Sequence, residues 1–244
     1  MINFSLLSPD SLIGSGIRAI ISGIPPGLEV RVLQGPMRGY RWAFGSGNPG
    51  YFLGSYKLSK QKKLQQFLKE GDVFFDLGAH VGFFTLLASH FVGDQGRVVA
   101  FEPNPDNIKY LKKHIEWNKR RNITVFEAAI GDRNCLVSFD PCRRSAMGSI
   151  CSTGSMTVQM LSLDYLYEAA NIPAPQIIKI DIEGSECIAL KGAQKLISEC
   201  RPVIFVSSHG SELHQDCVSL FGELDYRVDY IDDEPDEIIA IPNN

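Results

Sequence analysis

The sequence lacks several features that mark particular classes of protein. None of its six cysteines forms a Cys-x-x-Cys pair, so no zinc knuckle or dithiol redox motif is present. Their scatter is typical of reduced thiols in a cytosolic protein. No apolar run is long enough to span a bilayer, and the N-terminal segment lacks a basic start and is interrupted by Pro9, Asp10 and Arg18. We therefore expect a soluble cytoplasmic protein with no integral membrane segment.

The chain also lacks an excess of basic residues. Its formal net charge is −4 over 244 residues, which argues against a nucleic-acid partner bound through a broad basic surface. With 44% hydrophobic and 21% charged residues, the composition is that of an ordinary globular protein. The length suits one large α/β domain with a short appendage, and no internal repeat is visible.

The order of apolar patterns predicts strands alternating with helices. Residues 1–50 form an N-terminal extension with a probable hairpin over 28–44, and residues 51–244 form the main domain. Strands are expected at 73–77, 97–102, 123–130, 177–181 and 203–206, helices at 58–68, 81–91, 105–119, 163–170, 186–198 and 213–221, extra strands at 137–139 and 156–160, and an antiparallel pair at 226–231 and 237–240. This alternation predicts a Rossmann-like, seven-stranded, mostly parallel sheet with helices on both faces.

Ligands of such sheets bind beyond the carboxyl ends of the strands, so the residues there matter most. The first strand ends in Asp76 and runs into a turn with Gly78 and Gly82. Gly78 permits a tight turn, and the amides that begin the next helix favour an anion, while Asp76 favours a cation. Together they suit a zwitterion such as an amino acid, although a plain strand-to-helix turn has the same pattern. The Gly-x-Gly-x-x-Gly spacing of a dehydrogenase is absent.

Acids and a histidine follow the later strands. Glu102 lies where an acid can accept both hydroxyls of a ribose, or it can act as an acid near the start of the next helix. Asp181 and Glu183 follow a buried strand, where acids are costly unless paired or functional. His209, followed by Gly210, is a candidate general base, with a hydrogen-bonded surface histidine as the alternative. The small residues of 128–132 could flank an adenine ring.

These motifs occur in a family-specific order. The segments VFFDLGAHVGFFTLLAS, VVAFEPNPDNIKYLKKHIEWN, IKIDIEGSECIALKGAQKLI and RPVIFVSSHG resemble the FkbM-type family of class I S-adenosylmethionine-dependent methyltransferases over residues 51–210. The resemblance implies O-methylation of a hydroxyl or carboxylate of a metabolite or glycan, with S-adenosylmethionine as cofactor and no metal.

The resemblance also assigns residues. The expected cofactor site comprises Asp76, Gly78, Ala79, His80, Gly82, Thr85, Glu102, Asn104, Ala129, Ile130 and Asp181. Asp181, Glu183 and His209 are expected to face the methyl group and the acceptor, with His209 the first choice of base. Tyr56, Arg143 and Arg144 are expected on the acceptor side, where the arginines could bind a phosphate or carboxylate, unless their loop is simply solvated.

Three residues depart from the family pattern. His80 replaces an asparagine in the glycine turn, Lys57 follows Tyr56 where a glutamate is usual, and Ser207 replaces an acid two residues before His209. The last two lie on the expected acceptor side. They leave room for a non-catalytic protein that retains the cofactor-binding fold, besides a dehydrogenase or a nucleic-acid methyltransferase. The acceptor and the oligomeric state do not follow from the sequence.

Overall fold

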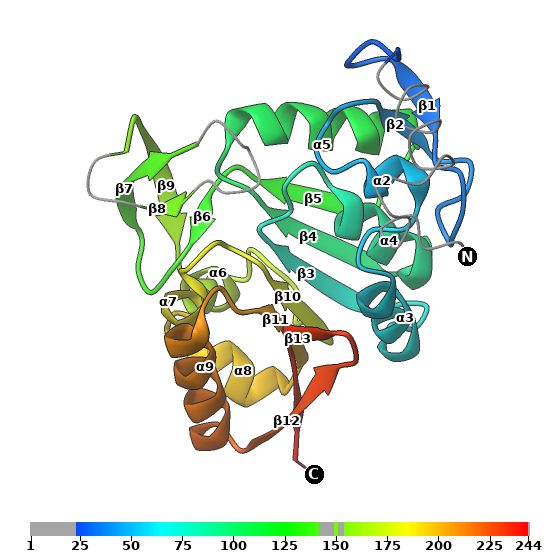
Figure 1. Ribbon diagram of the computed structural model, residues 1–244. Helices are drawn as coiled ribbons and strands as arrows, with labels where there is room; N and C mark the ends of the chain where they lie inside the picture. The colour runs from blue at the N-terminus through cyan, green and yellow to red at the C-terminus, as the bar shows by residue number, and fades with distance from the viewer. Residues whose placement is uncertain (1–22, 142–148, 151–153, 244) are drawn as a thin grey trace.

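A computed structural model describes residues 23–141, 149–150 and 154–243, and its central feature is a seven-stranded sheet (Figure 1). The strands lie in the order β12-β13-β11-β10-β3-β4-β5. Their bounds are β3 Val73–Leu77, β4 Arg97–Phe101, β5 Ile123–Phe126, β10 Ile177–Ile180, β11 Val203–Ser207, β12 Tyr226–Ile231 and β13 Glu234–Pro242. The five strands from β11 to β5 run parallel, and β12 and β13 are antiparallel. The predicted fold class is confirmed.

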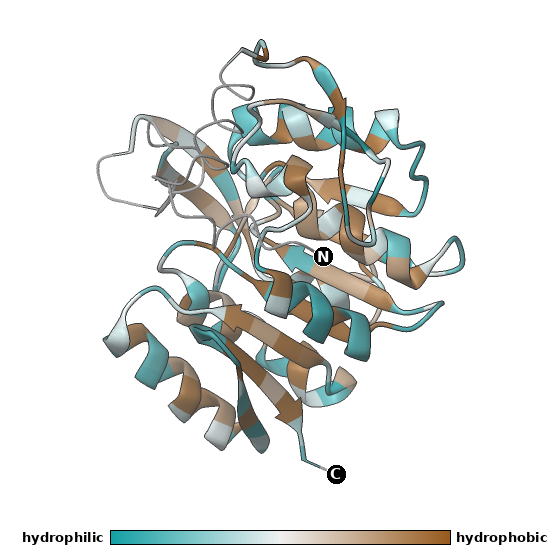
Figure 2. Cartoon of the chain, turned by 45° about the vertical axis from the view of Figure 1, so that its right-hand side comes forward, coloured by the Kyte–Doolittle hydropathy of each residue, from teal (hydrophilic) through white to brown (hydrophobic). Residues whose placement is uncertain are grey.

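Helices cover both faces of this sheet (Figure 1). They are α2 Gly50–Leu53, α3 Leu58–Phe67, α4 Phe83–Val92, α5 Pro105–Trp117, α6 Leu163–Glu168, α7 Glu186–Lys191, α8 Gln194–Cys200 and α9 Ser211–Glu223. Side chains alternate between the faces along each strand. Thus Phe75 and Leu77 join the core beneath α6 to α9, whereas Phe74 joins the core with α3 and α4. Figure 2 shows the hydrophobic strands between helices whose outer faces are hydrophilic.

Two predicted elements were too long. The expected strand 123–130 is two strands, because the chain leaves the central sheet after β5 and enters a second sheet as β6 Ala129–Ile130. This four-stranded sheet has the order β6-β9-β7-β8, with β7 Cys135–Asp140, β8 Ser149–Ile150 and β9 Met156–Leu161. The expected helix 186–198 breaks into α7 and α8 at Gly192, where a side chain would overlap the backbone of Gly131.

The N-terminal hairpin packs against the domain that follows it. Strands β1 Glu29–Arg31 and β2 Arg41–Ala43 are antiparallel, which confirms the hairpin. Trp42 is buried and stacks on His114 of α5, with ring centroids 3.8 Å apart. The Ala43 amide donates to His114 Nε2 at 3.0 Å, and His114 Nδ1 donates to the Val81 carbonyl at 2.8 Å. One buried histidine thus joins the hairpin to the glycine turn.

Candidate functional site

The glycine turn lies against the end of a neighbouring strand. Gly78 has a left-handed backbone, with φ of 78°, and a Cβ at this position would overlap the carbonyl oxygen of Asp181. Gly82, with φ of 94°, packs against Leu111 of α5. The close approach that requires Gly78 is therefore made by β10, not only by a ligand as the sequence suggested. The turn and the strand end that carries Asp181 form one surface.

Beneath the turn is a fully buried ion pair. Asp76 Oδ1 lies 2.9 Å from Lys179 Nζ, and Asp76 Oδ2 accepts a hydrogen bond from the Thr85 hydroxyl at 2.6 Å. Lys179 also donates to the Gly78 carbonyl at 2.8 Å. Burial lowers the pKa of Lys179, but Asp76 and Asp181 outweigh it and hold the pKa above its usual value. Asp76 and Thr85 are unexposed, so in this structure they brace the turn from below.

Lys179 was missed in the sequence, because the strand 177–180 was treated as an apolar core strand. The strand register places Lys179 beside Asp76, on the face of the sheet that carries α4. Its signal was the single charge within Ile-Ile-Lys-Ile, since a lysine is rarely buried without a partner.

Glu102 is held in place at the end of β4. Its Oε2 accepts the His80 amide at 2.7 Å, and its Oε1 accepts the Asn104 amide at 2.9 Å and the Asn107 side chain at 3.1 Å. Burial raises the pKa of Glu102, and these hydrogen bonds oppose that shift. The Asn104 side chain caps α5 by accepting the Asp106 amide at 3.0 Å. A carboxylate has about four acceptor positions, so Glu102 can accept a further hydroxyl.

His80 contacts the N-terminal segment. Its backbone is left-handed, with φ of 52°, and its Nδ1 lies 3.3 Å from the Tyr51 hydroxyl. Burial and the nearby Lys179 lower the pKa of His80 to about 4, so the ring is neutral at neutral pH. The adjoining cavity holds about 30 Å³, roughly the room of one water molecule. It is lined by Tyr51, Tyr56, Gly78, Ala79, His80, Phe83, Phe84, Lys179 and Asp181.

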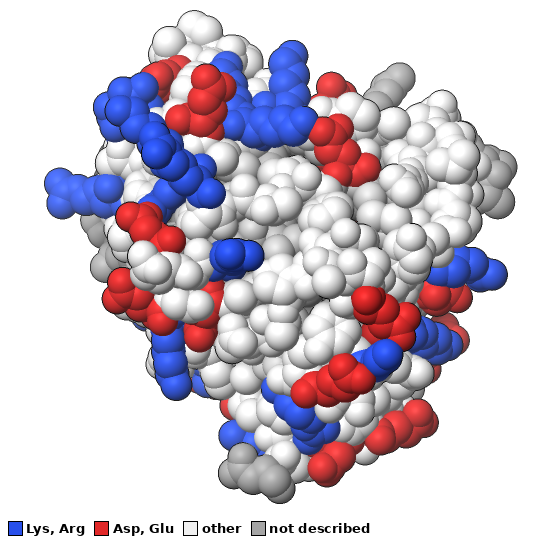
Figure 3. Space-filling model, turned by 180° about the vertical axis from the view of Figure 1, so that it is seen from behind, with Lys and Arg blue, Asp and Glu red and all other residues white. Residues whose placement is uncertain are grey.

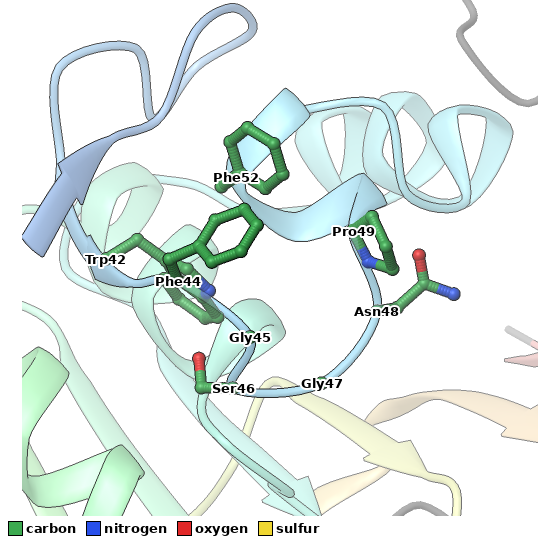
Figure 4. A pocket seen from close by; sticks show the side chains of 8 residues that line it. All are labelled: Trp42, Phe44, Gly45, Ser46, Gly47, Asn48, Pro49 and Phe52. Atoms are coloured by element: carbon green, nitrogen blue, oxygen red, sulfur yellow. The ribbon is translucent and has the colours of Figure 1, made fainter. Parts of the chain in front are cut away.

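A second small pocket lies in the N-terminal segment (Figure 4). It is formed by the loop from Gly45 to Pro49 together with Trp42, Phe44 and Phe52. The rings of Phe44 and Phe52 pack edge to face, with centroids 5.3 Å apart. A Cβ at Gly47 would meet the side chains of Tyr51 and His80, so this loop borders the glycine turn. The N-terminal segment therefore forms one wall of the site.

Asp181, Glu183 and His209 meet beyond β10 and β11. His209 Nε2 lies 3.6 Å from Asp181 and 3.5 Å from Glu183. His209 Nδ1 donates to Glu186 at 2.8 Å, and this bond raises the pKa of His209 despite its partial burial. Burial alone would raise the pKa of Asp181, but three lysines outweigh it and hold the pKa well below its usual range. Glu186, fully buried at the start of α7, was missed in the sequence.

The same group has a composition that metals use. One ligand atom from each of Asp181, Glu183 and His209 lies within 4.8 Å of the others, which suits a divalent cation as well as an ion-paired histidine. His209 also opens on a surface depression of about 460 Å³ between the β10–α7 loop and the start of α9. An acceptor can reach the histidine from this side.

A second charged group adjoins Asp181. Glu237 of β13 accepts Lys57 at Oε1 and Lys60 at Oε2, the latter at 2.6 Å. The Ser207 hydroxyl donates to Glu237 at 2.9 Å and accepts from Lys60 at 2.8 Å. Lys57 and Ser207, the two unusual residues of the acceptor side, are therefore connected through one carboxylate that sequence reasoning did not single out.

The remaining predicted residues are more distant or not described. Ala129 and Ile130 are buried in β6, in the smaller sheet. Arg143 and Arg144 lie outside the described residues. Acidic and basic side chains are interspersed on the face in Figure 3. Within the described ranges, no helix combines the length and the apolar character that crossing a membrane requires.

Fold and site together define a class of protein. The doubly wound sheet, the glycine turn after β3 and the acid after β4 are those of a Rossmann-like domain that binds a nucleoside-containing cofactor. The family model of the methyltransferase FkbM domain matches residues 76–228. The chain belongs to this family, as the sequence predicted.

Individual relatives agree with this assignment. The hexuronic acid methyltransferase AglP of Haloferax volcanii is 31% identical over 160 residues, which are 64% of this chain and 63% of AglP. The chain thus aligns with less than two thirds of that relative. Methyltransferase FkbM from Methylobacillus flagellatus KT has a TM-score of 0.52, with 23% identity over 71% of this chain and 44% of that one. An S-adenosylmethionine-dependent O-methyltransferase from Thermotoga maritima has a TM-score of 0.51, with 12% identity over 93% and 81%. These two structures support the fold alone.

Proposed function

We propose that this protein transfers the methyl group of S-adenosylmethionine to an oxygen atom of a glycan or small metabolite. The observation that carries the proposal is the convergence of Glu102, the glycine turn and the Asp181–His209 pair at one edge of the sheet. Family membership supports the reaction class. The relative AglP supports a sugar acid as the first acceptor to test.

The residues present fit the cofactor. Glu102 retains an acceptor position for a ribose hydroxyl, and Asp181 is an ionised group beside the turn that suits a cation. The cofactor supplies an electrophilic methyl group and needs no activation by the protein. Since the cavity next to His80 has room for only about one water molecule, Tyr51 and Tyr56 must shift to admit a methionyl group.

The remaining task of the protein is to align the acceptor and remove its proton. Alignment can be worth an effective molarity of about 10⁵–10⁸ M. The Glu186 carboxylate fixes the proton of His209 on Nδ1, which leaves Nε2 as the basic nitrogen on the side of Asp181. We assign His209 as the general base for a hydroxyl acceptor. Tyr56 lines the same cavity and would contact the acceptor.

The test begins with calorimetric titration of the protein with S-adenosylmethionine, S-adenosylhomocysteine and NAD. Micromolar binding of the first two is expected. Production of S-adenosylhomocysteine is then measured with oligosaccharides that end in a uronic acid and with their neutral counterparts. NAD binding alone would contradict the cofactor, and cofactor binding without turnover on any acceptor would favour the non-catalytic alternative.

A further inference from the structure

Lys57 occupies an unusual position at the wall of the site. It precedes the first turn of α3 and has a left-handed backbone, with φ of 44°, although it is not glycine. Its side chain is 27% exposed, so the ammonium group is directed inward and not into solvent. Such a backbone is unfavourable for a lysine and persists only where surrounding contacts hold it. The contacts of the ammonium group show what holds it.

Glu237 anchors Lys57 from a distant part of the chain. The Glu237 side chain is 3% exposed, and besides Lys57 it binds Lys60, whose side chain is 0% exposed. The Ser207 hydroxyl completes the group, because Ser207 and Glu237 face each other in the register of β11 and β13. Every partner of the Glu237 carboxylate is therefore itself fixed by an element of the fold. A carboxylate held in this way gives the Lys57 ammonium a fixed position.

The ammonium group of Lys57 reaches Asp181 from this anchor. Lys57 Nζ lies 4.0 Å from Asp181 Oδ2, and Lys179 Nζ lies 3.9 Å from the same oxygen. The other oxygen, Oδ1, faces His209 Nε2 at 3.6 Å. Two lysines therefore attract one oxygen of Asp181, and the second oxygen is turned toward the proposed base. Lys179 is committed to Asp76 and Gly78, so Lys57 is the partner whose removal leaves the strand pair β3–β10 intact.

We propose that Lys57 and Glu237 act as a positioning pair, in which Glu237 fixes the Lys57 ammonium and Lys57 orients the Asp181 carboxylate toward His209. The inference rests on the proposed methyl transfer. It assigns a purpose to both departures on the acceptor side: Ser207 makes room for, and binds, a carboxylate supplied by β13, and Lys57 is the cation that this carboxylate holds.

The test compares Lys57→Met, Lys57→Arg and the matched control Lys62→Met, which changes an exposed lysine of the same helix. Replacement by Met is expected to lower kcat about 10- to 100-fold, the loss typical of a misplaced group near the reaction. The KM values for cofactor and acceptor should stay within about threefold. The Arg variant should recover most of the rate, and the control should match the wild type. A change confined to the acceptor KM would overturn the proposal and make Lys57 an acceptor-binding residue.

Glu237→Gln tests the other member of the pair. If Glu237 acts through Lys57, adding Glu237→Gln to Lys57→Met should lower kcat by less than about twofold more, provided that the double variant is folded by circular dichroism. Multiplying effects would contradict the pair.

Crystal structures of the wild type and Lys57→Met decide the matter without turnover. We expect the Asp181 carboxylate to rotate away from His209 in the variant. An unmoved Asp181 would overturn the proposal even if no acceptor is found. Failure of the proposed function itself would instead appear in the wild type, as absent methyl transfer with every acceptor.

Discussion

Lys179 and Asp76 form an unexposed ion pair between the neighbouring strands β10 and β3, with 2.9 Å between Nζ and Oδ1. Removing one member of such a pair leaves a buried charge without compensation, which typically costs about 3–5 kcal/mol. The pair therefore ties the strand that carries the glycine turn to the strand that ends at Asp181.

Replacement of His209 by Ala tests the proposed base. Turnover on a hydroxyl acceptor should fall about 10²–10⁴-fold, the usual contribution of a general base. Cofactor affinity should change little, since His209 lies beyond Glu183 and Asp181 on the acceptor side. Rapid-quench kinetics and calorimetry measure the two effects, with His214→Ala as a histidine control on the following helix. Unchanged turnover would remove the role and point to a carboxylate acceptor, which needs no base.

Replacement of Glu102 by Ala tests the cofactor site. The variant loses the acceptor for a ribose hydroxyl and the anchor of the His80 and Asn104 amides. We expect the affinity for S-adenosylmethionine to fall at least about tenfold, the equivalent of one charge-assisted hydrogen bond of about 1.5–3 kcal/mol. Calorimetry with Glu127→Ala, an exposed acid beyond the next strand, provides the control. Equal affinities would show that the cofactor lies elsewhere.

Gly78→Ala separates two reasons for a glycine. At Gly71 the backbone is also left-handed, with φ of 90°, but an added Cβ has nothing within 4 Å, so Gly71→Ala should cost only the backbone strain of about 1–2 kcal/mol. At Gly78 the overlap with Asp181 adds about 1–3 kcal/mol, as overpacking usually does. Urea unfolding of both variants measures the difference. Equal losses would mean that β10 can move away from the turn.

Stability should depend on pH through His114. Burial lowers its pKa from 6.5 to about 4, so between these values the unfolded chain binds a proton that the folded protein does not. The free energy of unfolding should therefore fall as the pH decreases from 6.5 to 4, by up to about 3 kcal/mol from this residue. Urea unfolding of the wild type and His114→Gln across this range is the measurement. The variant should show a smaller slope, and identical slopes would contradict a neutral His114.

The sequence predicts a reaction without a metal, although Asp181, Glu183 and His209 are close enough to hold one. Protein treated with EDTA and then desalted should retain its turnover, and added Mg²⁺ or Mn²⁺ should change the rate by less than about twofold. If EDTA abolishes turnover and Mg²⁺ restores it, these three residues bind a catalytic cation. His209 would then be a ligand and not the base.

Local patterns in the sequence were sufficient for much of the fold. Hydrophobic periodicity and glycines gave the strand at 73–77 with its true bounds, and the rule that sites lie at strand ends brought Asp181 and His209 together correctly. The two splits were missed because their causes are tertiary. Gly192 ends α7 because of the Gly131 backbone, and β6 leaves the central sheet to pair with β9.

The charged contacts of the site were harder to predict. Lys57 and Glu237 are 180 residues apart, and their pairing depends on how β13 returns antiparallel to β11. Neither residue has a local signal for this contact. Lys179 could have been suspected as a lone charge in an apolar strand, but its partner follows only from the register of β10 against β3.

The contact between Gly78 and the Asp181 carbonyl limits how such a protein can be re-engineered. A glycine turn transplanted from another enzyme would also need a β10 of matching position, since any side chain there collides with the strand end. The same contact sets how far the cofactor can stand from the acceptor. A change of acceptor is therefore more easily obtained in the N-terminal wall around Tyr51 and Tyr56 than at the junction of the two strands.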